Sequence, residues 1–271
     1  MLVNEKETPW REQLTLADLA REIKPDAEIA VLNGFPLLPE DWDKTPVGCE
    51  DTVTLLRQGE GPTAEDFRFL LEERHTPEVA RPLAQAVVGI AGCGGLGSHA
   101  AYALARAGVG RLIVADLDVI EPSNLNRQAY RLCQIACPKA ESLASDLAAV
   151  NPAVRVDYHC LRLTGENIPV IFADCDIVLE CFDKPDQKRM LVETVLRELP
   201  RATVIAASGL AGTGDGNAIV ARKIRDRFFL VGDGESAASS PRGLLAPRVM
   251  VAAGQQALLA LRIILDEVKN A

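Results

Sequence analysis

The chain has little of what marks membrane, secreted or nucleic-acid-binding proteins. No apolar run approaches the roughly 20 residues that span a bilayer, and the charged N-terminal segment lacks the apolar stretch of a signal peptide. With 29 Lys and Arg against 38 Asp and Glu, the formal net charge is −9. Because polyphosphate backbones bind basic surfaces, we expect no nucleic-acid partner, and the short apolar runs exclude a membrane-spanning protein.

Cys-x-x-Cys pairs are also absent, although the chain contains seven cysteines. This spacing is typical of structural zinc sites, so we expect no zinc. Scattered free thiols favour a reducing compartment. The sequence therefore predicts a cytoplasmic protein.

Gly and Pro are dense in segment 59–62, which reads GEGP and predicts a linker. In the predicted domain 1–62, the Thr-x-x-Asp pattern at 15–18 indicates a helix start, and residues 29–32 and 52–56 read as strands. This pattern is typical of a small mixed α/β domain.

The second predicted domain, 63–271, begins with a helix over 63–84. The apolar side of this helix carries Phe67, Phe69, Leu70 and Leu71.

From residue 86 onward, apolar strands alternate with helices. The expected strands are 87–91, 112–115, 177–182 and 203–206, and the expected helices are 98–107, 138–149, 185–199 and 247–268. Continuously apolar strands between helices are typical of a parallel sheet that is covered on both faces. The expected fold is α/β, a Rossmann-like, mostly parallel sheet with helices on both faces.

A glycine-rich turn joins the first of these strands to its helix. Its glycines allow backbone N–H groups to approach a phosphate at a helix N-terminus; they are Gly92, Gly94, Gly95 and Gly97. Asp116 ends the next strand, 19 residues beyond Gly97, where a carboxylate can accept hydrogen bonds from ribose hydroxyls. The order of these features predicts a nucleotide site. An empty tight turn and an NAD-dependent oxidoreductase remain compatible with the glycines.

The polar loop 116–128 favours a triphosphate over NAD. It offers acids such as Asp118, an amide pair that includes Asn124, and the cation Arg127. The loop is expected at the carboxyl edge of the sheet, where ligands bind in open α/β folds.

Two further side chains fit a bound triphosphate. Lys139 stands at the N-terminal end of the helix over 138–149, where a cation is unfavourable unless an anion binds; the alternative is a solvated surface lysine. Asp183 follows a strand and either caps the next helix or holds Mg²⁺ that bridges nucleotide phosphates.

Together, the runs AGCGGLGS, ADLDVIEPSNLNRQ, CPKAES and ECFDK resemble the ThiF/MoeB adenylyltransferases, relatives of ubiquitin-activating enzymes. The resemblance covers about residues 70–268 and is closest to the ThiF branch of thiamine biosynthesis. It implies ATP-dependent adenylylation of the C-terminal carboxylate of a ThiS-type sulfur-carrier protein, with release of pyrophosphate. It also implies a homodimer.

The resemblance assigns roles to individual residues. The four glycines would form the phosphate loop, and Asp116 would hold the ribose. Asp118 would also contribute to ATP binding. The triphosphate would be contacted by Asn124, Arg127 and Lys139, and Mg²⁺ by Asp183. In the family, an arginine near the start of the domain reaches the partner subunit's nucleotide; the candidate here is Arg74, which could equally be an ordinary surface arginine.

Two departures from the family pattern concern cysteine. The chain lacks the two Cys-x-x-Cys pairs that often bind zinc in the family, and no cysteine follows Cys181. The late crossover loop around 232–245 therefore cannot supply a thioester or persulfide. Because Cys181 lies in an apolar strand, we expect it to be buried and adenylylation to proceed without a covalent carrier–enzyme intermediate through that loop.

Residues 1–62 resemble a ThiS-type β-grasp, or ubiquitin-like, carrier through the runs LTLADLAREI, IAVLNGFPLLPEDWDKT and EDTVTLLRQGEG. A functional carrier ends in a free Gly-Gly carboxylate, whereas this chain continues through Gly61-Pro62. We expect a structural or regulatory remnant, or an internal mimic that occupies or gates the carrier-docking groove.

Three alternatives stay open beside the carrier adenylyltransferase. An NAD-dependent oxidoreductase would have no need of Arg127, Lys139 or Asp183. A non-catalytic interaction protein would have no use for both cations and the Asp. Adenylylation of a different small acid would use the same chemistry.

Overall fold

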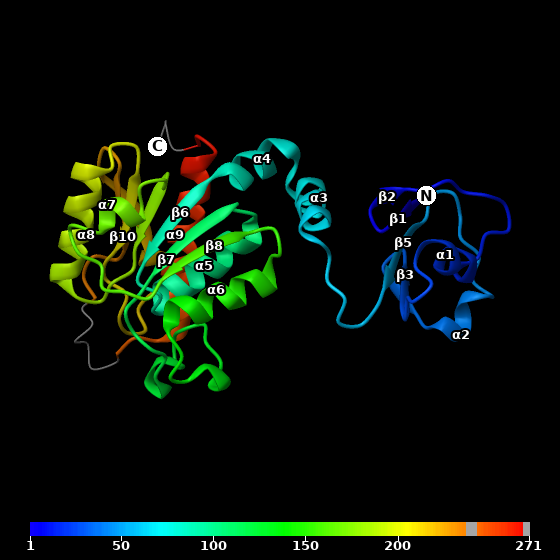
Figure 1. Ribbon diagram of the computed structural model, residues 1–271, viewed down its shortest axis with the longest axis horizontal. Coiled ribbons are helices and arrows are strands. Elements are labelled where there is room, and N and C mark those ends of the chain that lie inside the picture. The colour runs from blue at the N-terminus through cyan, green and yellow to red at the C-terminus, as the bar shows by residue number, and fades with distance from the viewer. Residues whose placement is uncertain (237–242, 268–271) are drawn as a thin grey trace. The chain divides into compact units, whose positions relative to one another are not determined.

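The computed structural model describes residues 1–236 and 243–267. The chain divides into two compact units, Met1–Pro62 and Thr63–Ala271, which are drawn in Figure 1. Each unit has hydrophobic clusters built from its own residues.

The N-terminal unit is a β-grasp fold, as predicted. Its sheet has the order β2-β1-β5-β3-β4. The strands are β1 (Leu2–Val3), β2 (Lys6–Glu7), β3 (Ile29–Leu32), β4 (Phe35–Leu37) and β5 (Thr52–Leu56), and the helices are α1 (Leu16–Ile23) and α2 (Pro39–Trp42). The helix start predicted at 15–18 is confirmed, and it is a capping box: the Thr15 hydroxyl accepts a hydrogen bond from the Asp18 backbone N–H, and the Asp18 carboxylate accepts one from the Thr15 backbone N–H. Leu16 and Leu19 then pack in one cluster with Val53 and Leu55 of the sheet.

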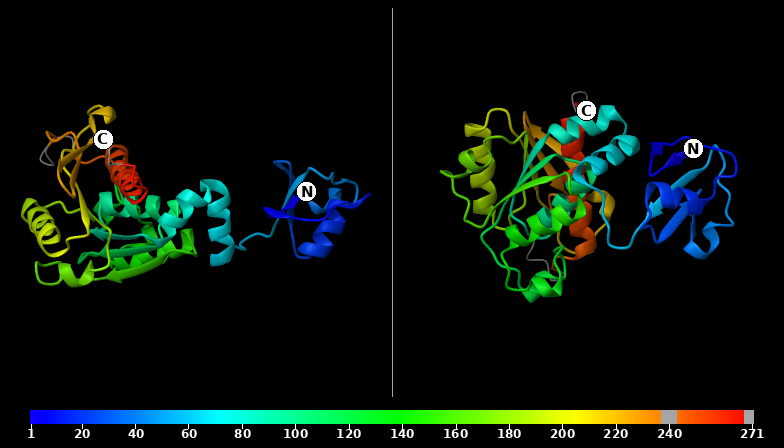
Figure 2. Two further views of the ribbon diagram at one scale, coloured as in Figure 1. Left: turned by 90° about the horizontal axis from the view of Figure 1, so that it is seen from above. Right: turned by 45° about the vertical axis from the view of Figure 1, so that its right-hand side comes forward.

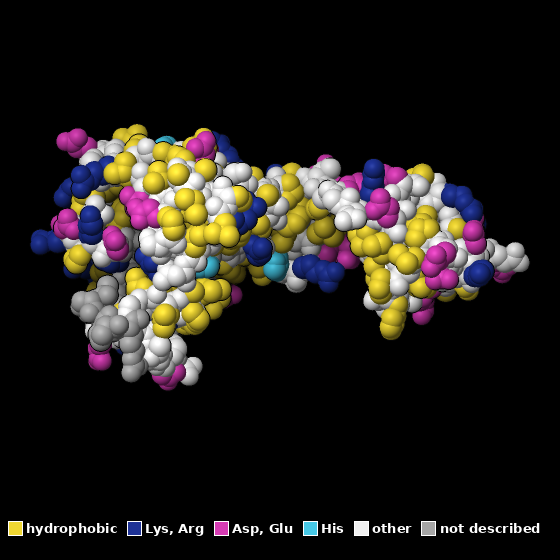
Figure 3. All heavy atoms as spheres, turned by 90° about the horizontal axis from the view of Figure 1, so that it is seen from below, with side chains coloured by type: hydrophobic (Ala, Val, Ile, Leu, Met, Phe, Trp, Pro, Cys, Tyr) yellow, Lys and Arg dark blue, Asp and Glu magenta, His cyan; other side chains and the backbone are white. Residues whose placement is uncertain are grey.

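Apolar side chains also gather on the outside of this unit, as Figure 3 shows. Phe35 is 74% exposed and Leu38 is 55% exposed. The unit therefore presents apolar surface that its own residues do not cover.

The second unit contains a seven-stranded sheet of order β11-β12-β10-β9-β6-β7-β8. The strands are β6 (Val87–Ala91), β7 (Arg111–Ala115), β8 (Arg155–His159), β9 (Ile177–Glu180), β10 (Thr203–Ala207), β11 (Val220–Arg225) and β12 (Phe228–Gly232). All neighbours run parallel except β11 and β12, so the predicted mostly parallel sheet is confirmed. The edge strands β8 and β11, and β12 beside β11, had not been predicted.

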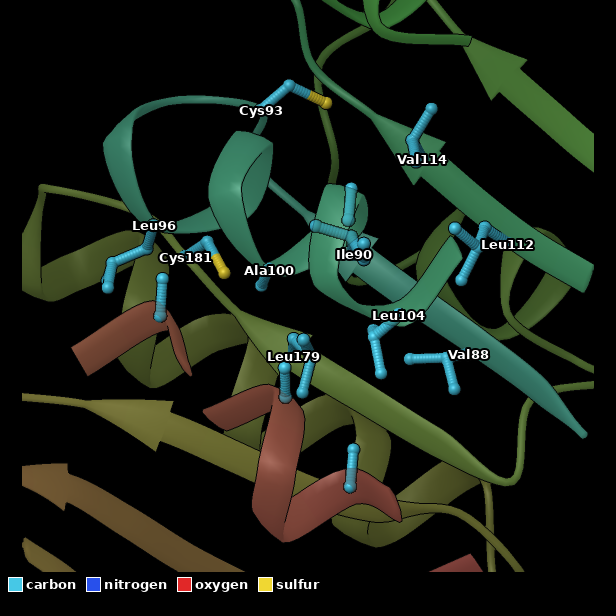
Figure 4. Packing of buried hydrophobic residues seen from close by; sticks show 14 of the residues in the cluster. Val88, Ile90, Cys93, Leu96, Ala100, Leu104, Leu112, Val114, Leu179 and Cys181 are labelled. Carbon is cyan, nitrogen blue, oxygen red and sulfur yellow. The ribbon is translucent and has the colours of Figure 1, made fainter. Parts of the chain in front are cut away.

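Helices cover both faces of this sheet (Figures 1 and 2). One face packs against α5 (Gly95–Ala107), α6 (Lys139–Val150) and α9 (Ala246–Ile264), and the other against α7 (Ile168–Ile171) and α8 (Pro185–Glu198). Figure 4 shows Leu96, Ala100 and Leu104 of α5 gathered with Ile90 and Leu179 of the sheet. Among the described residues, none of the helices has both the length and the apolar composition of a membrane span.

The single helix predicted over 63–84 is wrong. Two helices, α3 (Ala64–His75) and α4 (Pro77–Gln85), meet at Thr76, whose φ of 67° and ψ of 151° lie outside the helical region. The residue before a proline disfavours helical geometry, and Pro77 suits the first turn of a new helix. No residue of α3 is buried, so its predicted apolar side contributes no core.

Several predicted boundaries also shift, and the helix expected from residue 98 starts at Gly95. The strand expected over 177–182 ends at Glu180, and the last helix ends at Ile264. Residue 268, the predicted end of that helix, lies outside the described residues.

Candidate active site

A cavity of about 840 Å³ lies at the carboxyl ends of the central strands. Most of the predicted site residues line it, contributed by the loops after β6, β7 and β9 and by the start of α6. They are Gly92, Gly94, Gly95, Asp116, Asp118, Asn124, Arg127, Lys139 and Asp183. Of the predicted residues, Gly97 and Arg74 do not line it.

The glycine loop is shaped by close backbone contacts. Gly92 has a φ of +97°, which favours glycine, and a Cβ there would lie 3.0 Å from the Cys181 carbonyl oxygen. A Cβ on Gly97 would lie 1.9 Å from the Gly92 carbonyl oxygen. Gly97 therefore lies behind the loop, where it allows α5 to start against β6, while the N-terminus of α5 at Gly95 faces the cavity.

Asp116 holds the glycine loop against the end of β7. Its carboxylate accepts hydrogen bonds from the Cys93 N–H at 2.6 Å and the Asp118 N–H at 2.8 Å. Burial raises the pKa of Asp116, although both hydrogen bonds oppose that shift. The carboxylate thus lies at the cavity wall, close to the backbone of the phosphate loop.

Lys139 is not a solvated surface lysine, because only 6% of it is exposed. It is the first residue of α6, and its Nζ donates to Asp118 Oδ2 at 3.0 Å. Asp118 thereby offsets a cation that the helix dipole disfavours. The pair places a positive charge at the cavity wall, where a bound phosphate would also stabilise it.

Arg127 and Asn124 are fixed by the loop itself. The Arg127 guanidinium donates to the Ser123 carbonyl at 3.3 Å and to Asn126 Oδ1 at 2.8 Å, while Asn124 Oδ1 accepts from the Glu121 N–H at 3.1 Å. A Cβ on Gly95 would lie 3.3 Å from the Arg127 carbonyl oxygen, so this loop packs against the first turn of α5.

Asp183 is exposed and lines the cavity. The N-cap residue of α8 is Lys184 and not Asp183, so the capping role considered for Asp183 is wrong. A carboxylate is a hard oxygen ligand, which fits Mg²⁺ that is carried by a nucleotide. Asp183 is therefore suited to hold that ion.

Sequence reasoning missed three side chains that line the same cavity or lie next to it. Gln128 is buried, and its Oε1 has no hydrogen-bond partner among the described residues. Glu180 is fully buried and pairs with Lys188, which lines the cavity. A charged residue inside an otherwise apolar strand was the available signal for Glu180.

The predictions for Cys181 and for the late loop have different outcomes. Cys181 is buried, as predicted, and burial raises the pKa of its thiol, so it is a poor nucleophile. The other prediction concerns the loop around 232–245, which was expected to supply no thioester or persulfide. Residues 237–242 of this loop lie outside the described residues.

A second cavity of about 600 Å³ adjoins the first. The two share Lys188, Ala207 and Ser208. Its lining includes apolar side chains of α8 and β12, such as Leu196 and Phe228, together with basic side chains.

Comparison with known proteins identifies two families along the chain. The ThiF family matches residues 71–271, and ThiS-like ubiquitin matches residues 1–59. The adenylyltransferase and sulfurtransferase UBA4 of Candida glabrata is 34% identical over 69% of this chain and 44% of its own length. The protein of the same name from Pyricularia oryzae is 37% identical over 63% of this chain and 36% of its own length. The chain thus spans less than half the length of these relatives.

Solved structures share the fold at lower sequence identity. E. coli tRNA N6-threonylcarbamoyladenosine dehydratase, TcdA, in complex with ATP is 21% identical with a TM-score of 0.67, covering 75% of this chain and 95% of that one. E. coli MccB with ATP is 23% identical with a TM-score of 0.56, covering 70% and 58%. Because the ThiF family matches most of the chain and its glycine loop, the chain belongs to the ThiF family and carries a ThiS-like ubiquitin unit at its N-terminus.

Proposed function

We propose that this chain uses ATP to adenylylate the C-terminal carboxylate of a separate sulfur-carrier protein, with release of pyrophosphate. The observation that carries the proposal is one cavity that combines a helix N-terminus, several cations and several carboxylates. Lys139 and Arg127 face the same space as Asp116 and Asp183. This combination suits a ribose, a triphosphate and its metal better than it suits a dinucleotide.

The reaction needs positioning more than acid–base chemistry. A carboxylate oxygen of the carrier attacks the α-phosphorus of ATP, and the bond from this phosphorus to the α–β bridging oxygen breaks. Pyrophosphate leaves with that oxygen, and an acyl adenylate remains. Since a terminal carboxylate is already ionised at neutral pH, no general base is required.

Different groups of the cavity bind different parts of the nucleotide. Asp116 accepts from the ribose hydroxyls, while the N-terminus of α5 and Asn124 hold the phosphates. Arg127 and Lys139 stabilise the negative charge that moves onto the α-phosphate and the leaving group. Mg²⁺, held by Asp183 and the nucleotide, would neutralise phosphate charge.

The substrate is a separate carrier rather than the fused unit, because segment Gly59–Pro62 continues into α3 and offers no free carboxylate. We assign the carrier's Gly-Gly tail to the second cavity, which shares Lys188, Ala207 and Ser208 with the first. The place of the reaction in thiamine biosynthesis stays a prediction. The curated relatives are named for adenylyl and sulfur transfer, which supports a sulfur carrier as the acid.

We also propose a homodimer in which Arg74 serves the partner's nucleotide. Arg74 lies in the last turn of α3 and does not line the cavity of its own chain. Met250 and Leu258 of α9 are 50% and 52% exposed and lie on one face of that helix. A second copy that covers this face would bury apolar surface that the chain leaves in contact with solvent.

Carrier-dependent exchange of labelled pyrophosphate into ATP tests the proposal directly. The assay contains Mg²⁺, the full chain and a separate ThiS-type carrier that ends in Gly-Gly. We expect exchange with this carrier and none with a carrier that lacks its terminal glycine. Asp183→Ala and Arg127→Ala should each lower the exchange rate by about 10²- to 10³-fold, as removal of an electrostatic stabiliser does.

Binding of ATP, measured in parallel, separates the possible failures. Intact Mg²⁺-dependent ATP binding without exchange for any such carrier would refute the assigned substrate and favour a different small acid. Failure to bind ATP would refute the nucleotide site itself.

A further inference from the structure

An ion pair between a fully buried carboxylate and a partly exposed lysine lies at the edge of the nucleotide cavity. Glu180, at the end of β9, has no exposed surface, and both of its carboxylate oxygens accept from Lys188 Nζ, at 3.1 and 2.9 Å. Lys188 belongs to α8, and its ammonium also donates to the Ala207 carbonyl at the end of β10, at 3.1 Å. The three donors of this ammonium thus have three acceptors on two neighbouring strands.

This pair also fixes the turn that carries Asp183. Glu180 Oε1 accepts a hydrogen bond from the Phe182 N–H at 2.7 Å, directly before Asp183 in the chain. On the other strand, Ala207 is followed by Ser208, and both line the nucleotide cavity. One lysine therefore connects α8, the Asp183 turn and the end of β10.

Removing the Glu180 carboxylate from water is expensive, although the Lys188 side chain stays 27% exposed, and a structural role alone would be served as well by apolar side chains. The position of the pair is informative in this respect. Lys188 lines both cavities. The ends of β9 and β10, which it joins, lie at the nucleotide cavity. Hydrogen bonds that orient a metal-binding carboxylate commonly control how well the metal is bound.

We propose that Lys188 and Glu180 are positioning residues that hold the Asp183 turn and the end of β10 in the geometry that binds magnesium-bound ATP. The inference rests on the proposed function, because it takes Asp183 as the magnesium ligand. The pair acts through the backbone at Phe182 and Ala207.

Equilibrium binding of ATP by calorimetry, with and without Mg²⁺ and without any carrier, tests this role. Lys188→Met should weaken Mg²⁺-dependent ATP binding by about 10- to 100-fold, the range found when partners that orient metal ligands are removed. Binding of ATP without the metal should change much less. Lys188→Arg can still donate to both carboxylate oxygens, so we expect its binding to lie closer to wild type than to Lys188→Met.

Two further variants separate positioning from damage to the fold. Arg201→Met removes an exposed cation just after α8 that lines neither cavity, and it should bind as the wild type does. The double variant Glu180→Gln/Lys188→Met leaves no unpaired buried charge, yet it loses the lysine that joins Glu180 to the Ala207 carbonyl. We expect it to melt cooperatively and to remain weak in Mg²⁺-dependent binding.

Wild-type affinity in the folded double variant would overturn the proposal, because the defect of Lys188→Met would then come only from its unpaired carboxylate. Equal losses with and without Mg²⁺ would also overturn it. If the wild type binds magnesium-bound ATP but adenylylates no carrier, the assigned substrate is wrong while the positioning role stands. If the wild type binds no ATP, both proposals are wrong.

Discussion

Lys139 combines a buried position with a partner that a ligand can replace. Its Nζ is bound to Asp118, whose own side chain is largely exposed to solvent. Replacement by Met keeps the length of the side chain but removes the charge that would face the triphosphate. We expect Lys139→Met to fold and to lower the rate of pyrophosphate exchange by about 10²- to 10³-fold.

Lys223→Met is the matched control for that variant, since Lys223 is exposed on β11 and lines neither cavity. It should leave ATP binding unchanged. A wild-type exchange rate in Lys139→Met would show that this lysine serves only Asp118.

Gly97 permits a backbone contact that no other residue allows. A Cβ there would lie 1.9 Å from the Gly92 carbonyl oxygen, which cannot move without distorting the phosphate loop. We expect Gly97→Ala to lower the free energy of unfolding of the second unit by about 1–3 kcal/mol or more, and to abolish ATP binding. Urea denaturation and calorimetry check both effects.

Gly216→Ala is a suitable comparison, because a Cβ at Gly216 meets no atom within 4 Å. It should leave ATP binding unchanged. If Gly97→Ala binds ATP as tightly as Gly216→Ala does, the loop is less constrained than its geometry indicates.

Among the elements, β12 and α9 are joined by a second buried ion pair. Arg248, in the first turn of α9, pairs with Asp233 just after β12 and donates to the Gly214 carbonyl at 2.6 Å. Burial opposes the ionisation of Asp233, but hydrogen bonds from Ser236, the Glu235 N–H and Arg248 outweigh it and hold the pKa of Asp233 below its usual range.

The sign of this shift predicts a pH dependence. A carboxylate whose pKa is lowered by folding stabilises the fold above its unfolded pKa of about 3.9, and this contribution is lost as the pH falls through the folded value. Asp233→Asn should be less stable than the wild type by about 3–5 kcal/mol at pH 7, because it leaves Arg248 buried without its partner. The difference should narrow below about pH 4. Chemical denaturation at several pH values measures it, and a difference that stays constant down to pH 3 would contradict the assignment.

The elements show what sequence patterns reveal and what they miss. The buried parallel strand β6 has no polar side chain, and β9 has only Glu180, so both were predicted from their continuous apolar runs. By contrast, every residue of β11 is exposed, so its sequence VARKIR carries no apolar signal. The break at Thr76 depends on the local effect of Pro77, which the apolar periodicity of segment 63–84 concealed.

Those site residues could be predicted whose position in the fold follows from their place at the end of a strand. Asp116 and Asp183 follow parallel strands, whose carboxyl ends meet at one edge of the sheet, and the structure brings both to one cavity. Lys188 could not be predicted in this way, because its contact with Glu180 depends on how α8 is oriented against the sheet. A contact of this kind depends on tertiary packing, which no spacing along the chain encodes.

At the scale of the whole molecule, the fused ThiS-like unit is expected not to be a substrate. Its last strand, β5, leads into Gly59–Pro62 and then into α3, so the position of a carrier's terminal carboxylate is an ordinary peptide bond. Pyrophosphate exchange should therefore stay at background without an added carrier. Exchange by the intact chain alone, with mass spectrometry showing no cleavage near Gly61, would contradict this expectation.

The proposed homodimer predicts complementation between two defective variants. If each site combines Asp183 of one chain with Arg74 of the other, Arg74→Ala and Asp183→Ala chains are both impaired as homodimers. A heterodimer of the two contains one site with both native residues and one with neither. Random mixing makes about half of the dimers heterodimers, so exchange should recover to about one quarter of the wild-type rate. If Arg74 instead serves its own chain, every site in the mixture lacks one residue and no activity returns. Sedimentation of the mixture distinguishes this result from a failure to exchange subunits, and a monomeric wild type would refute the homodimer itself.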